Sequence, residues 1–211
     1  MPDTERMPAE SDVLEVASVD ALRGWLAANG ERSASVWLVR HRKGHPAHLT
    51  YDEIVNACIA FGWVDSQPRK LDAGRSLIRL SPRDPKSNWS AVNKARVARL
   101  ERDGLMTGSG RRMVALAKER GTWTFLNDVD RLEEPDDLAK ALDAQPEARR
   151  LWDRFPPSSR RGILEWIKVA KTDATRQTRI ALTVERAAEN RKANFPAGRD
   201  RGPKDGGSEE T

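Results

Sequence analysis

The chain has 211 residues, of which 38% are hydrophobic and 33% charged, and its formal net charge is +5. This length suits one domain, or one domain and a small module, and it allows a core that needs no disulfide or metal. With 32 acidic residues beside 37 basic ones, the basic excess does not by itself indicate nucleic-acid binding. No run approaches the ~20 apolar residues of a membrane helix. The first twelve residues also lack the apolar segment of a signal peptide, so we expect a cytoplasmic protein without membrane contact.

Cysteine and histidine usage argues against covalent and metal chemistry. Cys58 is the only cysteine, so no internal disulfide can form, and its apolar helical surroundings predict a small core residue. His41, His45 and His48 are spaced as H-x3-H-x2-H, but a glycine and a proline between them break any helix that could align their rings. No phosphate-loop, dinucleotide, nucleophile-elbow or zinc-protease motif is present. We therefore predict no metal and no cofactor, and the sequence names no catalytic set.

The first half of the chain predicts helices packed against a small, mainly antiparallel sheet, which is an α+β fold. Ser18 or Asp20 is placed to cap a short helix. Thr50 and Glu53 have the spacing of a capping box, so a second helix begins there, and Gly62 is placed to end it. β-branched and aromatic residues, with some alternation of apolar and polar positions, predict three strands, at residues 35–42, 63–71 and 76–81.

The second half predicts only helices. Ser87 or Asn88 is expected to cap the first of them, and two tryptophans on apolar faces, Trp152 and Trp166, are expected to dock a C-terminal helical module on the sheet. Both ends of the chain are polar, which predicts disorder. The expected parts are a disordered tail at 1–12, an α+β domain at 13–132, a helical module at 133–191 and a disordered tail at 192–211.

The stretch from Phe61 to Asn93 is predicted to form a binding site. Between Phe61 and Arg96 there are eight basic and three acidic residues, an excess of five that equals the charge of the whole chain. Two prolines lead into a helix start, whose free N–H groups favour anions, and arginine offers a fork suited to phosphate or carboxylate. We predict that a small anionic or polar ligand binds beside two indoles, and that its site is formed by Trp63, Asp65, Ser66, Arg69, Arg79, Arg83, Lys86, Ser87, Trp89 and Asn93.

Other interpretations remain open at this point. The same residues suit a structural joint, in which the serines cap, the arginines pair with acids and the indoles fill the core. They also suit an enzyme that uses Asp65 with Arg79 and Arg83, or, less well, a nucleic-acid surface. In the C-terminal part, Lys168, Lys171, Arg176 and Arg179 predict a solvated helix face, or else a second side of the basic pocket. The sequence leaves the oligomeric state open.

Several long motifs resemble one protein family. They are F-G-W-V-D-S-Q, R-L-S-P-R-D-P-K-S-N-W-S-A-V-N and G-L-M-T-x-x-G in the first half, and D-D-L-A-K-A-L and A-K-T-D-A-T-R-Q-T-R-I in the second. Together they resemble the YdeI/OmpD-associated, or bacteriocin-protection, family over roughly residues 17–190. The resemblance implies a helical C-terminal module and a role in protection against antimicrobial peptides, and it brings no catalytic mechanism. Asp173 and Ala174 stand where Pro-Glu is usual in that family.

Overall fold

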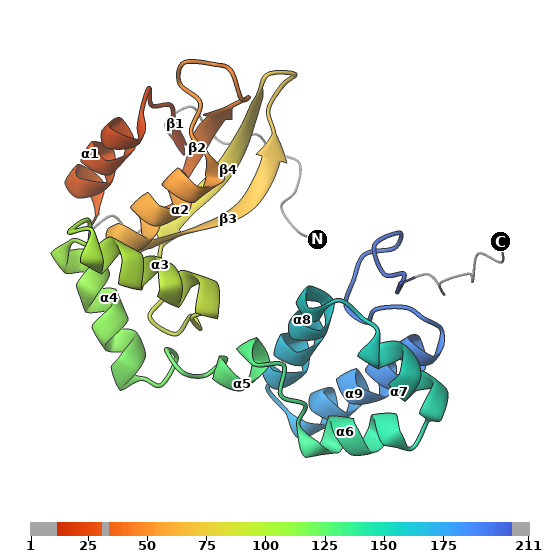
Figure 1. Cartoon of the computed structure of the whole chain (residues 1–211). Coiled ribbons are helices and arrows are strands. Elements are labelled where there is room, and N and C mark those ends of the chain that lie inside the picture. Colours follow the sequence, from red (N-terminus) through yellow and green to blue (C-terminus); the bar gives the residue numbers. More distant parts are fainter. Residues whose placement is uncertain (1–11, 31–33, 204–211) are drawn as a thin grey trace. The chain divides into compact units, whose positions relative to one another are not determined.

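The computed structural model describes residues 12–30 and 34–203, and the chain divides into two compact units between Phe125 and Leu126 (Figure 1). The first unit contains a sheet with helices and the second is helical, which confirms the predicted α+β fold. The sequence placed the border after residue 132. The structure places it earlier, because Leu126 and Val129 are already buried in the core of the second unit.

The sheet has four strands in the order β1-β2-β4-β3. Three of them are antiparallel neighbours and match the predicted strands, with β2 at Val36–His41, β3 at Trp63–Lys70 and β4 at Arg75–Pro82. The fourth, β1 at Val13–Leu14, pairs in parallel with β2. Sequence reasoning missed β1, because two residues are too short to show an alternating pattern.

The two faces of the sheet differ. Leu38 and Ile78 are cross-strand partners and lie on the face that packs against α1 (Val19–Asn29) and α2 (Tyr51–Ala60) in the main core. Trp37 and Leu77 lie on the opposite face, where they form a smaller apolar cluster with Val39. Since side chains alternate along a strand, this division decides which of the predicted site residues can meet.

The local signals at the helix ends mostly agree with the structure. Ser18 caps α1, and the Thr50–Glu53 capping box is complete, with the Thr50 N–H donating to Glu53 Oε2 over 2.7 Å. Gly62 follows α2 with φ of +76°, a conformation that glycine adopts at little cost. Cys58 lies fully buried in α2, as predicted.

The start of α3 (Ala91–Arg102) is a correction. Its cap is Ser90, whose Oγ accepts from the Asn93 N–H over 3.4 Å, and neither Ser87 nor Asn88 fills that role. The chain before the helix is committed elsewhere, because the Trp89 N–H donates to the Thr122 carbonyl over 3.2 Å. The helix therefore begins after Trp89, at Ala91.

The G-S-G run at 108–110 opens α4 (Gly108–Glu119) and serves packing. A Cβ on Gly110 would lie 2.3 Å from the Ala60 carbonyl oxygen, so only glycine permits this approach of α4 to the end of α2. Thr107 strengthens the same contact, since its hydroxyl donates to the Ala60 carbonyl over 2.6 Å.

The second unit contains the helices α5 (Asn127–Asp130), α6 (Asp136–Asp143), α7 (Pro146–Asp153), α8 (Pro157–Lys168) and α9 (Asp173–Ala188). Trp152 is fully buried in the core of this unit, so the prediction that it docks on the sheet is wrong, and Trp166 packs against the same core. No helix among residues 12–30 and 34–203 has the length and apolar character needed to span a membrane.

The predicted C-terminal tail is partly wrong. Residues 192–203 continue the second unit: Ala193 is buried, Phe195 packs on the core, and Asp200 pairs with Arg191. The sequence signal failed because this segment has few apolar residues and is held mainly by polar contacts. The remaining tail predictions, at 1–11 and 204–211, fall outside the described residues.

Candidate functional site

The two tryptophans of the predicted site are core residues. Trp63 is 1% exposed and meets Trp25 edge-on at 5.7 Å between ring centroids. Trp89 is 2% exposed and lies 5.2 Å from Trp123. Neither ring presents a face to solvent, so neither supplies the stacking wall that the sequence suggested. Their burial agrees with the structural interpretation of both residues.

Arg83 is buried with them. Its guanidinium lies 3.9 Å from the centroid of the Trp89 ring, only 5% of the residue is exposed, and one nitrogen donates to the Asn88 carbonyl over 2.6 Å. The Nε atom is buried without a hydrogen-bond partner in the described structure. Burial lowers the pKa of Arg83 to about 10, an effect that the more distant Asp65 partly opposes.

Asp65 and Arg79 lie on opposite faces of the sheet. Asp65 pairs with Leu80 on the helix-covered face and accepts a 2.7 Å hydrogen bond from the Tyr51 hydroxyl. Burial, followed by this bond, raises the pKa of Tyr51 to about 12. Arg79 faces the other way and donates from Nε to Ser35 Oγ over 3.0 Å. The expected convergence of Arg79 with Arg83 is therefore not found, and an enzyme that uses Asp65 with Arg79 lacks its geometry.

The remaining predicted residues are dispersed. Ser66 lies on the Arg79 face, with its hydroxyl 3.5 Å from the Arg79 carbonyl. Lys86 and Ser87 belong to a turn held by backbone and side-chain oxygens of Asp84, and Asn93 lies in the first turn of α3. Arg69 stands near the far end of β3, where its guanidinium covers the Trp37 ring at 4.5 Å. The residues do not form one pocket.

A different hollow in the same unit gathers more charge. It has a volume of about 640 Å³ and lies where β2 ends and the β3–β4 hairpin turns, and we call it the hairpin-end hollow. Antiparallel pairing brings these strand ends together, because His41 is the partner of Arg75 and Lys70 that of Ser76. The two pairs lie on opposite faces of the sheet, so residues of both faces line the hollow. The hollow is lined by Arg40, His41, Arg42, Lys43, His48, Pro68, Arg69, Lys70, Asp72, Arg75 and Ser76.

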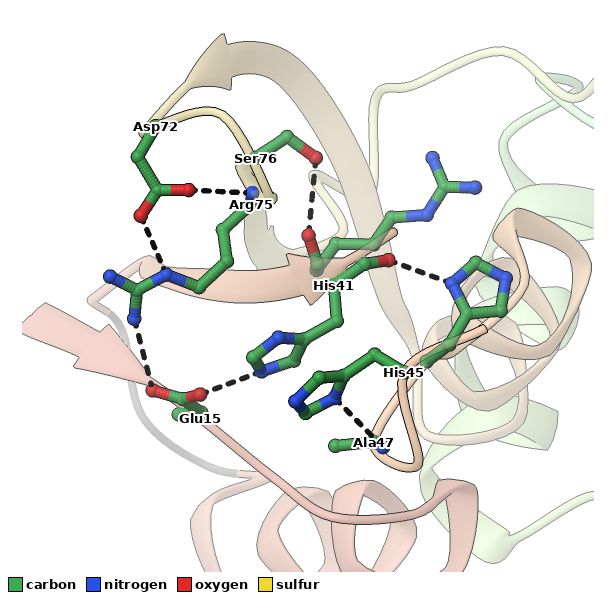
Figure 2. Close-up of polar contacts among 9 residues, drawn as sticks. Glu15, His41, His45, Ala47, Asp72, Arg75 and Ser76 are labelled. Carbon is green, nitrogen blue, oxygen red and sulfur yellow. Dashed lines mark hydrogen bonds and ion pairs between the residues drawn. The ribbon is translucent and has the colours of Figure 1, made fainter. Parts of the chain in front are cut away.

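One side of the hairpin-end hollow is a connected set of polar contacts (Figure 2). Asp72 accepts from Arg75 Nε over 2.8 Å and also from the Gly74 and Arg75 N–H groups, each over 2.8 Å. The Arg75 bond is the main reason that the pKa of Asp72 is lowered. Arg75 also approaches Glu15 at 3.9 Å, and Glu15 contacts His41 Nε2 at 2.7 Å. These contacts hold Arg75 and His41 in place.

The three histidines lie near one another without forming a metal site. His41 and His45 stack at 3.9 Å between ring centroids, and His48 Nδ1 lies 2.7 Å from the His41 carbonyl oxygen. The Ala47 N–H donates to His45 Nδ1 over 3.1 Å. Ring nitrogens of all three are thus engaged with the protein, and the described residues contain no cluster of His, Cys, Asp or Glu suited to a metal.

Sequence reasoning named Arg69 as a site residue and counted the charges of Lys70 and Arg75, but it missed the three other cations of this hollow. Arg40, Arg42 and Lys43 come from the end of β2 and the loop after it, about thirty residues before Lys70 in the chain. The available signal was the run R-H-R-K at 40–43, followed by a turn, opposite a second turn at 72–74. Recognising it required the register of β2 with β4.

The second unit has its own hollow, of about 310 Å³, which we call the helical hollow. It is lined by Asp128, Val129, Glu133, Glu134, Pro135, Leu164, Lys168 and Arg176. Its cations are engaged: Lys168 Nζ lies 2.6 Å from Asp128 Oδ1, and Arg176 makes two bonds of 2.7 and 2.8 Å to Asp137. The predicted solvated face is therefore wrong for Lys168 and Arg176.

Arg179, another member of that predicted face, lies over the Trp166 ring at 4.9 Å and donates to the Trp166 carbonyl. Its guanidinium is used for packing within the second unit. Lys171 is exposed and agrees with the solvated interpretation.

Comparison with known proteins gives two matches to family models. Residues 14–113 match a domain of unknown function, DUF8412, and residues 131–190 match the family described as bacteriocin-protection, YdeI or OmpD-associated. The first range contains the hairpin-end hollow and the motifs at 61–93, while the second contains most of the helical hollow. No curated protein and no solved structure shows a significant match. The match to the YdeI or OmpD-associated family thus covers residues 131–190, the later part of the resemblance predicted over residues 17–190, while residues 14–113 match a different family model.

Proposed function

We propose that the first unit binds a small anionic ligand in the hairpin-end hollow. The observation that carries the proposal is the charge of its lining, which has six cationic side chains and one carboxylate. Six minus one leaves an excess of +5 around a hollow of about 640 Å³, a size typical of small-molecule sites. Such a concentration of one sign in a concave surface attracts the opposite charge.

Several of these cations are available to a ligand. Within residues 12–30 and 34–203, the side chains of Arg42, Lys43 and Lys70 have no hydrogen-bond or ion-pair partner. Arg75 is positioned by Asp72, and Arg40 donates from Nε to the Leu49 carbonyl over 3.2 Å. The hollow therefore combines guanidinium groups held by the fold with free ammonium and guanidinium groups, and both kinds bind oxyanions well.

The proposal keeps the predicted ligand class and moves its site. The sequence placed the anion beside Trp63, Trp89 and Arg83, which the structure buries. The hairpin-end hollow lies at the opposite end of the β3–β4 pair, since Trp63 begins β3 and Lys70 ends it. The family description that names bacteriocin protection matches residues 131–190, and the binding proposal does not depend on it.

The test is a calorimetric titration of the full chain with inorganic pyrophosphate, for the wild type and two matched variants. Lys70→Gln removes one free cation of the hollow and is expected to weaken binding about tenfold, or about 1.4 kcal/mol. Lys86→Gln removes the same charge from an exposed residue of the sequence-predicted site and is expected to leave the affinity unchanged.

Nuclear magnetic resonance of the indole N–H groups locates the ligand independently. Trp37 lies under Arg69, which lines the hollow, so its signal is expected to shift during the titration, while those of Trp63 and Trp89 stay in place. Shifts confined to Trp63 and Trp89, with weakened binding only in Lys86→Gln, would return the site to the stretch predicted from the sequence. No heat and no shift would refute anion binding.

A further inference from the structure

We infer that the ligand of the hairpin-end hollow is an oligophosphate, a small molecule with three or more linked phosphates, recognised through its phosphates alone. This inference rests on the proposed anion binding and adds the ligand's class and the basis of its selection. It follows from three features of the hollow: the amount and spread of positive charge, the absence of an aromatic platform, and the position of its carboxylates.

The charge is too large and too widely spread for one phosphate group. Arg42 and Lys43 come from the loop after β2, Lys70 from the end of β3 and Arg75 from the start of β4. A single phosphate carries at most about two negative charges at neutral pH and can accept from only a few donors at once. A chain of three phosphates carries about twice that charge and can contact cations from several of these segments together. The excess of +5 is thus matched by an oligophosphate.

The lining offers no surface on which a nucleobase could stack. Among the described residues that line the hollow there is no tryptophan, tyrosine or phenylalanine. The nearest indole, Trp37, is 9% exposed and is covered by the Arg69 guanidinium at 4.5 Å. The His41 ring has one face against His45. Since base recognition usually relies on an aromatic or otherwise free planar surface, the affinity is expected to come from phosphate contacts.

The carboxylates give the hollow one side that an anion avoids. Asp72 and Glu15 are grouped around Arg75 and His41, on the side shown in Figure 2. The free cations Arg42, Lys43 and Lys70 lack such neighbours, so the phosphate chain is expected to lie along them. A nucleic-acid duplex needs an extended basic surface, and a concave site bordered by two carboxylates favours a short, flexible polyanion instead.

The test compares phosphate, pyrophosphate, tripolyphosphate and adenosine triphosphate by calorimetry, with the full chain in a buffer free of divalent cations. Tripolyphosphate is expected to bind at least about 30-fold more tightly than phosphate, which corresponds to about 2 kcal/mol. Adenosine triphosphate is expected to bind within about threefold of tripolyphosphate, because the base adds no contact.

A double variant tests whether the free cations cause the preference for a longer phosphate chain. Lys43→Gln with Lys70→Gln is expected to reduce the preference for tripolyphosphate over phosphate to about threefold or less. Lys86→Gln with Arg99→Gln removes the same charge from exposed residues outside the hollow and should keep the preference intact. Thermal unfolding of both double variants checks that the fold is retained.

Each outcome decides between the two proposals. Equal affinity for phosphate and tripolyphosphate, lost in Lys70→Gln, would overturn the oligophosphate inference and leave anion binding in place. A strong preference for adenosine triphosphate would also overturn it, since it would reveal a base site. Displacement of tripolyphosphate by a short DNA duplex at low concentration would indicate a nucleic-acid surface. Failure of every anion to bind would refute both proposals.

Discussion

The two hollows contain the same kinds of side chain and use them differently. In the hairpin-end hollow, six cations face one lining carboxylate, and three of the cations have no partner in the described structure. In the helical hollow, Lys168 and Arg176 are each bonded to an aspartate of the same unit. The difference shows that composition alone does not identify a binding site. Charge is available to a ligand only where the fold has not already neutralised it.

On the proposed function, one set of charges serves stability and the other serves binding. In the second unit, ion pairs join the connector before α6 to α7, α8 to α5 and α9 to α6, so they hold helices together. In the first unit, the cations of the hollow lie at strand ends and in a loop, and few of them join elements. Substitution of a paired charge in the second unit should therefore lower stability and leave anion binding unchanged. Substitution of a free cation in the hairpin-end hollow should weaken anion binding and leave stability nearly unchanged.

The largest expected loss of stability is at Glu134. Its carboxylate accepts from Arg149 over 2.6 and 2.9 Å and from the Trp152 indole over 2.7 Å, and 18% of its side chain is exposed. Glu134→Ala leaves the Trp152 indole N–H without its acceptor and leaves Arg149 with Asp153 as its remaining hydrogen-bond partner, and it is expected to lower the free energy of unfolding by about 2–3 kcal/mol in urea denaturation. The neighbouring Glu133→Ala removes only an exposed ion pair with Arg131, so its expected loss of stability is small. A loss comparable to that of Glu134→Ala would show that the contacts of Glu134 are not the cause of its effect.

Arg176 and Lys70 give the direct contrast between the two hollows. Arg176→Gln breaks a two-bond contact with Asp137 and is expected to cost about 1–2 kcal/mol of unfolding free energy without changing pyrophosphate affinity. Lys70→Gln is expected to change unfolding by less than about 0.5 kcal/mol, since its side chain has no partner to lose. The contrast fails if Arg176→Gln weakens pyrophosphate binding or if Lys70→Gln destabilises the protein measurably.

Acid should weaken the second unit through its carboxylates. The pKa of Glu134 is lowered mainly by its hydrogen bond to Arg149, and that of Asp137 mainly by its bond to Arg176. Because each folded-state pKa lies below the unfolded value of about 4, the stabilisation is present above that value and is lost as pH falls through the folded-state pKa. Thermal unfolding from pH 6 down to pH 3 is expected to show this loss. It should be smaller in Arg176→Gln, which has already lost one of the two contacts.

The sequence predicted the helices and strands better than the sites. A helix or strand is specified by residues close together in the chain, whereas a site brings together residues that are far apart in it. Thr50 with Glu53 specifies a helix start within four residues, and alternation specifies β3 and β4 locally. The hairpin-end hollow instead depends on pairing His41 with Arg75, which are far apart in sequence. The predicted site failed at Arg79 for a related reason: alternation correctly gave its strand face, but it could not tell that Trp63 lies on the other face.

Arg83 gives the sharpest test of what remains of the sequence-predicted site. It is a buried cation with no carboxylate within ion-pair distance among the described residues, so its burial carries a desolvation cost. Arg83→Met keeps an apolar body over Trp89 and removes the charge, but it leaves the Asn88 carbonyl without its donor. Because these changes oppose each other, we expect the unfolding free energy to stay within about 1 kcal/mol of the wild type.

Arg83→Lys separates packing from charge. Lysine keeps the charge but loses the planar contact with Trp89, so it should destabilise the protein more than methionine does if Arg83 is a packing residue. Urea denaturation of the wild type and both variants measures the order. If lysine is tolerated and methionine costs more than about 2 kcal/mol, the positive charge itself is required, and a counter-charge must be present at Arg83 in solution. That result would restore an anion site beside Trp89, and pyrophosphate titration of Arg83→Met would then show whether that site and the hairpin-end hollow bind independently.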